Sequence, residues 1–161
     1  MTTRILVAFY SWSGATAQVA QKLTTDLNVT ACQLDVADGT FTGDMYAVDA
    51  QAKRQKRTGQ LPVLTNVPVN LADYGLICVG GPVWSGTVAT PLLSFLKQLP
   101  DTAVLAPFYT HQGDPGDYER DFASAAGNRK VTAPLAVARG AVSQSDAQIA
   151  AWAKIIRQDM A

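Results

Sequence analysis

Segments of strand length and segments of helical period alternate along most of this chain, and this alternation constrains its fold more than any other feature. Apolar runs such as Arg4 to Tyr10 are nearly continuous, as in strands buried on both faces of a sheet. Each run is followed by a segment in which apolar residues recur every three or four positions, as in amphipathic helices. The pattern predicts βαβ units around a parallel sheet, and therefore an α/β fold.

We expect five strands and five helices. The strands are expected at Arg4 to Tyr10, Val29 to Val36, Leu76 to Gly80, Ala103 to Tyr109 and Val131 to Val137. The helices are expected at Gly14 to Leu27, Met45 to Lys56, Thr90 to Leu99, after Asp114-Pro115, and after Ser145. Residues 37 to 73 are rich in glycine and proline, so outside the one helix we expect an irregular connection. Thr90-Pro91 and Asp114-Pro115 predict capped helix starts, and Ser145 with Gln148 predicts a capping box.

Length and charge exclude several classes of protein. A chain of 161 residues predicts a single domain, residues 1–161. Thirteen basic and thirteen acidic residues cancel, which argues against nucleic acid or an anionic membrane as a partner. The longest apolar run, Ala103 to Tyr109, is far too short to cross a bilayer. The first residues do not resemble a secretory signal, so we expect a cytoplasmic protein. Cys32 and Cys78 lie in strand-like contexts, which predicts two free thiols and no metal site.

The loop after the first strand is the first candidate for chemistry. Ser11, Trp12, Ser13, Gly14, Ala15 and Thr16 join a buried strand directly to a helix start. Free N–H groups and the positive end of the helix dipole form an anion site, which hydroxyls can complete, and a phosphate monoester would suit it. The loop lacks the glycine and lysine pattern of nucleotide triphosphatases and the glycine pattern of dinucleotide folds. The alternative is that Ser13 only caps the helix.

Two further loops follow the third and fourth strands, and ligands of open α/β sheets bind where such loops meet. The loop from Gly80 to Thr87 places glycines around Trp84, which we expect to be exposed, and this favours close approach of a flat aromatic ligand. The alternative for Trp84 is a plug at the rim of the core. The loop from Thr110 to Asp114 carries His111, the only histidine, as a possible acid or as part of an ordinary surface turn.

These three loops resemble the flavin mononucleotide (FMN) loops of the flavodoxin family, especially its short bacterial members. The resemblance implies a three-layer fold with a five-stranded parallel sheet in the order 2-1-3-4-5, helices on both faces and non-covalently bound FMN. It implies that the first loop holds the phosphate and that the other two border the ring and the ribityl chain. By this resemblance the ring and ribityl contacts are Pro82, Val83, Trp84, Gly86, Thr87, Thr110, His111, Gln112 and Gly113.

Three functions remain open on the sequence. An acidic docking face is typical of flavodoxin-type electron carriers, whereas this chain has no net charge. That favours a small FMN-dependent oxidoreductase of the NAD(P)H or quinone reductase type, with a redox protein or a small-molecule acceptor as partner. The alternatives are a one-electron carrier and a binding module that has lost the flavin. The basic run Lys53 to Arg57 fits an anionic partner or, more simply, a solvated helix face. The chain is expected to be a monomer or a homodimer.

Overall fold

The main sheet contains five parallel strands in the order β2-β1-β3-β5-β6. A computed structural model of the chain describes residues 4–159. The parallel strands are β1 (Ile5–Phe9), β2 (Ala31–Gln33), β3 (Leu76–Trp84), β5 (Val104–His111) and β6 (Leu135–Ala138). A short strand, β4 (Thr87–Val88), folds back antiparallel on β3. Counted without β4, the parallel strands have the predicted order 2-1-3-4-5, and the predicted topology is confirmed.

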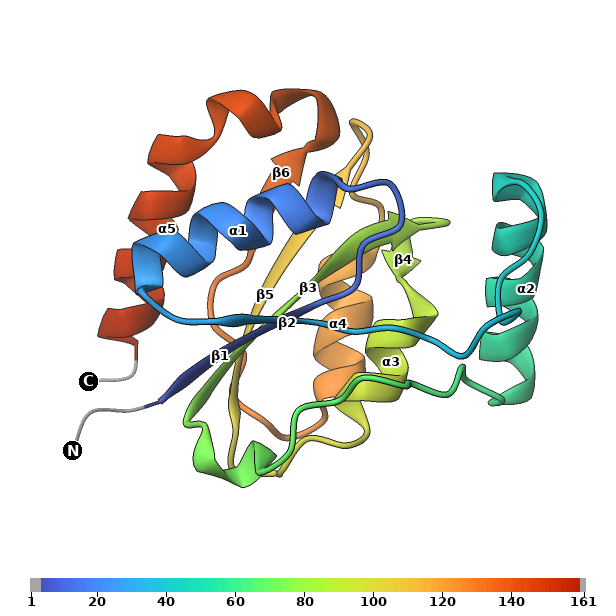
Figure 1. Cartoon of the computed structure of the whole chain (residues 1–161), viewed down its shortest axis with the longest axis horizontal. Helices are drawn as coiled ribbons and strands as arrows, with labels where there is room; N and C mark the ends of the chain where they lie inside the picture. The colour runs from blue at the N-terminus through green and yellow to red at the C-terminus, as the bar shows by residue number, and fades with distance from the viewer. Residues whose placement is uncertain (1–3, 160–161) are drawn as a thin grey trace.

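Helices cover both faces of this sheet, as predicted (Figure 1). They are α1 (Ala15–Leu27), α2 (Met45–Thr58), α3 (Thr90–Leu96), α4 (Tyr118–Ala126) and α5 (Asp146–Gln158), with short 3-10 helices η1 (Leu71–Asp73) and η2 (Arg139–Gln144). Apolar residues of α1 and α5 share one core cluster, and those of α2, α3 and α4 share the other. Figure 1 shows α2 at the edge of the molecule, away from α1 and α5.

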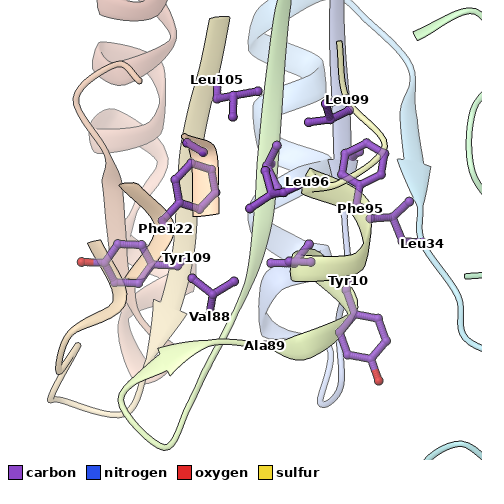
Figure 2. Close-up of a cluster of buried hydrophobic side chains, with 14 of the residues drawn as sticks. Tyr10, Leu34, Val88, Ala89, Phe95, Leu96, Leu99, Leu105, Tyr109 and Phe122 are labelled. Carbon is purple, nitrogen blue, oxygen red and sulfur yellow. The ribbon is translucent and has the colours of Figure 1, made fainter. Parts of the chain in front are cut away.

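The sheet separates two hydrophobic cores because alternate strand residues point to opposite faces. In β1, Val7 and Phe9 pack in the α1 and α5 core, whereas Leu6 and Ala8 pack in the other. Figure 2 shows part of this second core, with Tyr10 and Tyr109 at its margin and their hydroxyls directed away from its centre. These two cores sandwich a sheet whose central strands are buried on both faces, as the continuous apolar runs predict.

The last parallel strand begins later than the sequence pattern predicts. Val131 makes only an isolated bridge to Leu105, and β6 begins at Leu135. Pro134 lies between them, and proline cannot donate a backbone hydrogen bond to a ladder. Likewise, β2 is limited to Ala31–Gln33, a shorter strand than expected.

Three predicted side-chain caps are wrong. Ala89 is the N-cap residue of α3, Thr90 is its first residue, and the Thr90 hydroxyl donates to the Gln55 amide oxygen. The Asp114 carboxylate accepts the N–H of Gly116, 2.9 Å away, so it closes a turn and α4 begins only at Tyr118. The Ser145 hydroxyl donates to the Val142 carbonyl, and the Gln148 amide donates to the Ala136 carbonyl, so neither forms the predicted capping box. In each case the polar side chain binds a partner outside the helix that it was expected to cap, which local sequence spacing does not reveal.

Both cysteines are free, as predicted. Cys32 lies in β2 and Cys78 in β3, and β1 separates the two strands. Their side chains also join different cores, because Cys32 packs against the α2 and α3 side and Cys78 belongs to the α1 and α5 side. Among the helices of residues 4–159, none is long and apolar enough to span a membrane.

Candidate functional site

The carboxyl ends of β1, β3 and β5 meet at one edge of the sheet because these strands are neighbours. The loops that follow them surround a pocket of about 400 Å³, within the usual size range of small-molecule sites. Most of the predicted site residues line this pocket: Trp12, Ser13, Pro82, Val83, Trp84, Gly86, Thr110, His111 and Gln112. The structure thus brings residues from all three predicted loops into one cavity.

The predicted residues outside the pocket lining lie in the same loops and strand ends. They are Ser11, Gly14, Ala15, Thr16, Thr87 and Gly113. Several of them shape the backbone that carries the lining residues. Among the described residues, no group of three or more histidine, cysteine or acidic side chains is placed to hold a metal ion.

Ser11 organises the start of α1. Its hydroxyl oxygen accepts the N–H of Gly14 at 3.1 Å and the N–H of Ala17 at 3.3 Å. The residue at the N-cap is Gly14, whose φ of 99° favours glycine over any residue with a side chain. The alternative that Ser13 caps this helix is therefore wrong. Because Ser11 satisfies these donors, the Ser13 side chain is left to line the pocket.

Thr16 and Thr110 connect the first loop to the third. Their hydroxyl oxygens are 2.8 Å apart and both side chains are buried. Thr110 lines the pocket and Thr16 lies behind it. A hydrogen bond between two buried hydroxyls orders both loops, since breaking it leaves buried polar atoms without partners. The Thr16 hydroxyl thus serves as a link within the protein.

The segment expected as a glycine loop after the third strand is a continuation of that strand. β3 runs to Trp84, and Ser85 and Gly86, with φ values of 52° and 73°, turn the chain into β4. Two consecutive residues with positive φ form the two-residue turn favoured in β-hairpins. A Cβ on Gly80 would lie 2.0 Å from the Phe108 ring. This glycine is therefore required by core packing, and its expected role in approaching a ligand is wrong.

Trp84 is both a core residue and a pocket wall. Its side chain is only 6% exposed and meets Tyr10, Trp12 and Phe41 edge to face, with ring centroids 5.7, 6.2 and 5.2 Å apart. The expectation of an exposed indole at this position is wrong. Trp12 is the exposed one, at 40%, and it also lines the pocket. The rim-plug and pocket-wall interpretations of Trp84 are therefore compatible.

The third loop holds the His111 ring in one orientation. Its Nδ1 accepts the N–H of Gly113 at 3.0 Å, so in the neutral ring the proton is carried by Nε2. Gly113, with a φ of 112°, allows the chain to curl back onto the ring. His111 therefore brings an N–H donor to the lining of the pocket.

Sequence reasoning missed one wall of the pocket. Met45, Val48 and Asp49 of α2 line it, together with Ser85, Asp114 and Arg139. The Ser85 hydroxyl donates to the Asp49 carboxylate, which joins α2 to the β3–β4 turn. The helical period of residues 45 to 56 predicted this helix, but no local signal indicates where it packs.

Thr87 faces away from the pocket toward a polar cluster. Its hydroxyl donates to the Trp84 carbonyl at 3.0 Å and accepts from the Lys56 ammonium group. Lys56 also lies 3.3 Å from an Asp121 carboxylate oxygen, and that same oxygen accepts the N–H of Val88 at 2.9 Å. These contacts connect α2, β4 and α4. Of the basic run Lys53 to Arg57, Lys56 is thus occupied within the protein, whereas Lys53, Arg54 and Arg57 are exposed.

Burial changes the titration of Tyr10, which directly precedes the first loop. Desolvation raises its pKa to about 12, and the charge of Asp35 contributes in the same direction. Its phenol therefore stays protonated and neutral throughout the physiological pH range.

No family model matches the sequence, and no curated protein matches it. Several solved structures do match it. A Lactobacillus acidophilus NCFM flavoprotein, solved in complex with FMN, is 28% identical over 89% of this chain and 98% of that chain, with a TM-score of 0.78. The flavodoxin of Streptococcus pneumoniae TIGR4 is 11% identical over 98% of this chain and 99% of that chain, with a TM-score of 0.59.

An NADH:FMN oxidoreductase, in its apo form, is 14% identical over 99% of this chain and 91% of that chain, with a TM-score of 0.61. The matches at low identity support the fold, and the Lactobacillus flavoprotein adds similarity of sequence over nearly its whole length. The strand order, the three loops at the carboxyl edge and these similarities agree. The chain therefore has the flavodoxin-like fold, and its sequence is similar to that of the Lactobacillus flavoprotein.

Proposed function

We propose that this protein binds FMN without a covalent bond and acts as a small FMN-dependent oxidoreductase. The observation that carries the proposal is the pocket itself. It lies at the carboxyl edge of β1, β3 and β5, where the strand order reverses, and two tryptophans contribute to its walls. The similar Lactobacillus flavoprotein was solved with FMN, which supports the choice of cofactor.

The start of α1 fits the phosphate of FMN. Within the described chain, the N–H groups of Ala15 and Thr16 have no hydrogen-bond partner, as is usual in the first turn of a helix. They are free to donate to an anion, and the helix dipole favours negative charge there. Ser13 would add a hydroxyl, while Ser11 and Gly14 would hold the loop in shape.

The remainder of the pocket fits an aromatic ring system. Trp12, Trp84 and the β3–β4 turn would supply apolar contact, and Thr110, His111 and Gln112 would supply polar groups along one edge. The Nε2–H of His111 would donate a hydrogen bond to a ring acceptor. Bound FMN would supply the redox chemistry by accepting and releasing electrons. The protein would position the ring, shield it from water on the Trp84 side and leave the Trp12 side accessible.

Charge supports a reductase over a dedicated electron carrier. Carriers that dock on basic partners benefit from a strongly acidic face, and this chain has no net charge. A pocket with an exposed indole and the half-exposed side chain of Met45 at its mouth suits a small-molecule partner. The one-electron carrier and a cofactor-free binding module are the competing functions.

Titration of the purified protein with FMN and with riboflavin tests the proposal. At about −0.3 kcal/mol for each of roughly 31 non-hydrogen atoms, FMN should bind with a dissociation constant near 10⁻⁷ M. Ser13→Ala should weaken FMN binding by about tenfold and leave riboflavin binding unchanged, because only FMN carries the phosphate. Ser124→Ala, an exposed serine on α4, is the matched control and should change neither. A protein that binds no FMN would contradict the proposal.

Anaerobic reduction then separates the redox functions. Mixing the FMN-loaded protein with NADH or NADPH should bleach the flavin absorbance rapidly and in a single two-electron step. A loaded protein that neither nucleotide reduces, and that instead takes up electrons one at a time from a chemical titrant, would be a carrier.

A further inference from the structure

We propose that the outer face of α2 is a docking surface for an acidic protein, which binds beside the FMN pocket. The outer face consists of five residues at helical spacing: Tyr46, Ala50, Lys53, Arg54 and Arg57. This inference rests on the proposed function and names the chemical class of a redox partner. It assigns a role to the exposed part of the basic run, which the FMN site does not use.

The outer face has no partner within the protein. Its residues lie on the side of α2 opposite to Val48 and Ala52, the two residues that this helix buries. All five are exposed, so no other segment of residues 4–159 covers them. α2 itself lies at the edge of the molecule (Figure 1). A second protein can therefore reach this side of the helix along its whole length.

The charge of α2 is strongly unbalanced. The helix contains four cations and one carboxylate, whereas the whole chain has equal numbers of basic and acidic residues. Lys53 and Lys56 are paired with carboxylates of the chain, at 2.9 and 3.3 Å. Among residues 4–159, Arg54 and Arg57 form no ion pair, and their guanidinium groups make no hydrogen bond. Two groups suited to paired binding of carboxylates are thus free.

Tyr46 favours a protein over other anionic partners. Its side chain is 86% exposed at one end of the outer face, next to Met45, which is 49% exposed. Tyrosine, methionine and arginine are enriched in protein interfaces, where aromatic side chains fill pockets and arginines pair with carboxylates. Nucleic acids and anionic membranes are attracted by a wide positive field, which a chain with no net charge lacks. The outer face thus offers a short basic stripe with an aromatic anchor.

The outer face borders the FMN pocket. Met45 and Asp49 line the pocket, and both are on α2. Met45 directly precedes Tyr46 in the helix, and Asp49 forms the ion pair with Lys53. The docking surface and the pocket wall therefore share one helix and one ion pair. A protein bound to the outer face lies beside the mouth of the pocket, which a redox partner of bound FMN has to approach.

NMR titration of the isotope-labelled, FMN-loaded protein tests the docking surface. The probe is a copolymer of glutamate and tyrosine, which supplies both carboxylates and apolar side chains. At low salt it should shift the amide signals of the outer face of α2 and leave those of α5 unchanged. Salt at about 1 M should abolish binding, because it screens exposed charges. A copolymer of lysine and tyrosine should not bind this face.

Variants separate the docking surface from general attraction of anions. Arg54→Glu should weaken binding of the glutamate–tyrosine copolymer about tenfold, while Lys154→Glu, the same reversal on the exposed side of α5, should not change it. Tyr46→Ala should weaken copolymer binding about threefold and leave binding of poly-L-glutamate unchanged. None of the three should alter FMN affinity or melting temperature.

Several outcomes would overturn the docking surface. They are equal shifts on α2 and α5, full affinity in Arg54→Glu, and full affinity for the copolymer in Tyr46→Ala. An oligothymidylate or phosphatidylserine vesicles that bind the outer face as tightly as the copolymer would replace the acidic protein by another class of partner. FMN binding without copolymer binding rejects the docking surface alone, whereas copolymer binding to a protein that binds no FMN rejects the proposed function alone.

Discussion

The two faces of the sheet are covered in different ways. On one face, α1 and α5 bury apolar side chains such as Leu23, Trp152 and Ile156 directly against the strands. On the other face, α3 and α4 pack similarly, but α2 buries only Val48 and Ala52. α2 also makes polar contacts, which include the hydrogen bond of 2.6 Å between the Gln55 amide oxygen and the Thr90 hydroxyl.

The face covered by α1 and α5 is a tightly packed scaffold, whereas the face covered by α2 borders the pocket. Burial of apolar surface stabilises by about 25 cal/mol per Å², whereas partly exposed ion pairs contribute about 0–1 kcal/mol each. The helix that forms one wall of the pocket is therefore attached less strongly than α1 or α5. Elements around binding sites are commonly drawn from the less stable parts of a fold. We expect substitutions in the packed regions to lower global stability, and those at α2 to act locally.

The largest effect is expected at Trp84. Because its indole is buried among three aromatic rings, Trp84→Ala should lower the free energy of unfolding by about 3–5 kcal/mol and also weaken FMN binding. Trp12→Ala should weaken FMN binding by about 1 kcal/mol, with little loss of stability. Urea unfolding measures the stability of both variants, and titration with FMN measures their affinity. Equal destabilisation by the two substitutions would contradict the different burial of the two indoles.

Gly80→Ala should be the next most damaging change. Its new methyl group would overlap the Phe108 ring, which packs against Trp152 in the α1 and α5 core, at a cost of about 3 kcal/mol. Gly140→Ala is the control, because a Cβ there meets no atom within 4 Å. Thermal unfolding should separate the two variants clearly. A Gly80→Ala protein as stable as the parent would show that this core can rearrange.

The hydrogen bond between the Thr16 and Thr110 hydroxyls, which joins the first and third loops, should contribute about 2 kcal/mol to the free energy of unfolding. Thr16→Val leaves the buried Thr110 hydroxyl without its partner, and the reverse holds for Thr110→Val. The double variant should lose less stability than the two single losses added together, because it leaves no unsatisfied hydroxyl. Chemical unfolding of the three variants completes the cycle, and simple additivity would argue against a direct bond.

Alkaline pH should destabilise the hydrophobic core that α2, α3 and α4 share with the sheet. Tyr10, Tyr109 and Tyr118 all belong to that core, and burial raises the pKa of each, that of Tyr10 to about 12. For Tyr10, the raised pKa contributes stability that is fully present below pH 10 and is lost as pH rises toward 12. Tyr10→Phe should therefore make the decline of melting temperature between pH 10 and 12 shallower. An identical decline in parent and variant would remove Tyr10 as a cause.

The smallest global effect is expected at Lys56. Lys56→Met removes its contacts with Thr87 and Asp121, and it should change the free energy of unfolding by less than about 1 kcal/mol. Amide hydrogen exchange should nevertheless become faster in α2 and remain unchanged in α5. Faster exchange in both helices would show that α2 is coupled to α5 and is not attached independently.

Much of the architecture could be predicted from local patterns. Buried strands such as Ile5–Phe9 are recognised by continuous apolar runs, and amphipathic helices such as Ala15–Leu27 by apolar residues every three or four positions. Both patterns arise because side chains must match the faces that they pack against. The three loops of the site were predictable for a related reason, since they directly follow strands of a parallel sheet. Their contents predicted an anion site and an aromatic wall, and the structure brings residues of all three loops to one pocket.

Some of the wrong predictions depended on partners distant in sequence, and others on which of several nearby polar residues makes a local contact. The Ser11 hydroxyl accepts the N–H groups of Gly14 and Ala17, although neighbouring Ser13 has the same side chain. Gly80 is required by Phe108, a residue on the adjacent strand. Nothing in the spacing of either residue distinguishes these roles from the ones expected.

Local sequence patterns predicted the α/β class, the approximate positions of the five main strands and the loops that surround the pocket. Those properties follow from periodicity and from the conformational preferences of short segments, which each stretch of chain carries locally. Local patterns did not reveal that Trp84 is buried, that α2 forms a wall of the pocket or that Arg139 lines it. These outcomes depend on how β3, α2 and β6 are placed relative to one another, because packing between distant segments has no signature within any one of them.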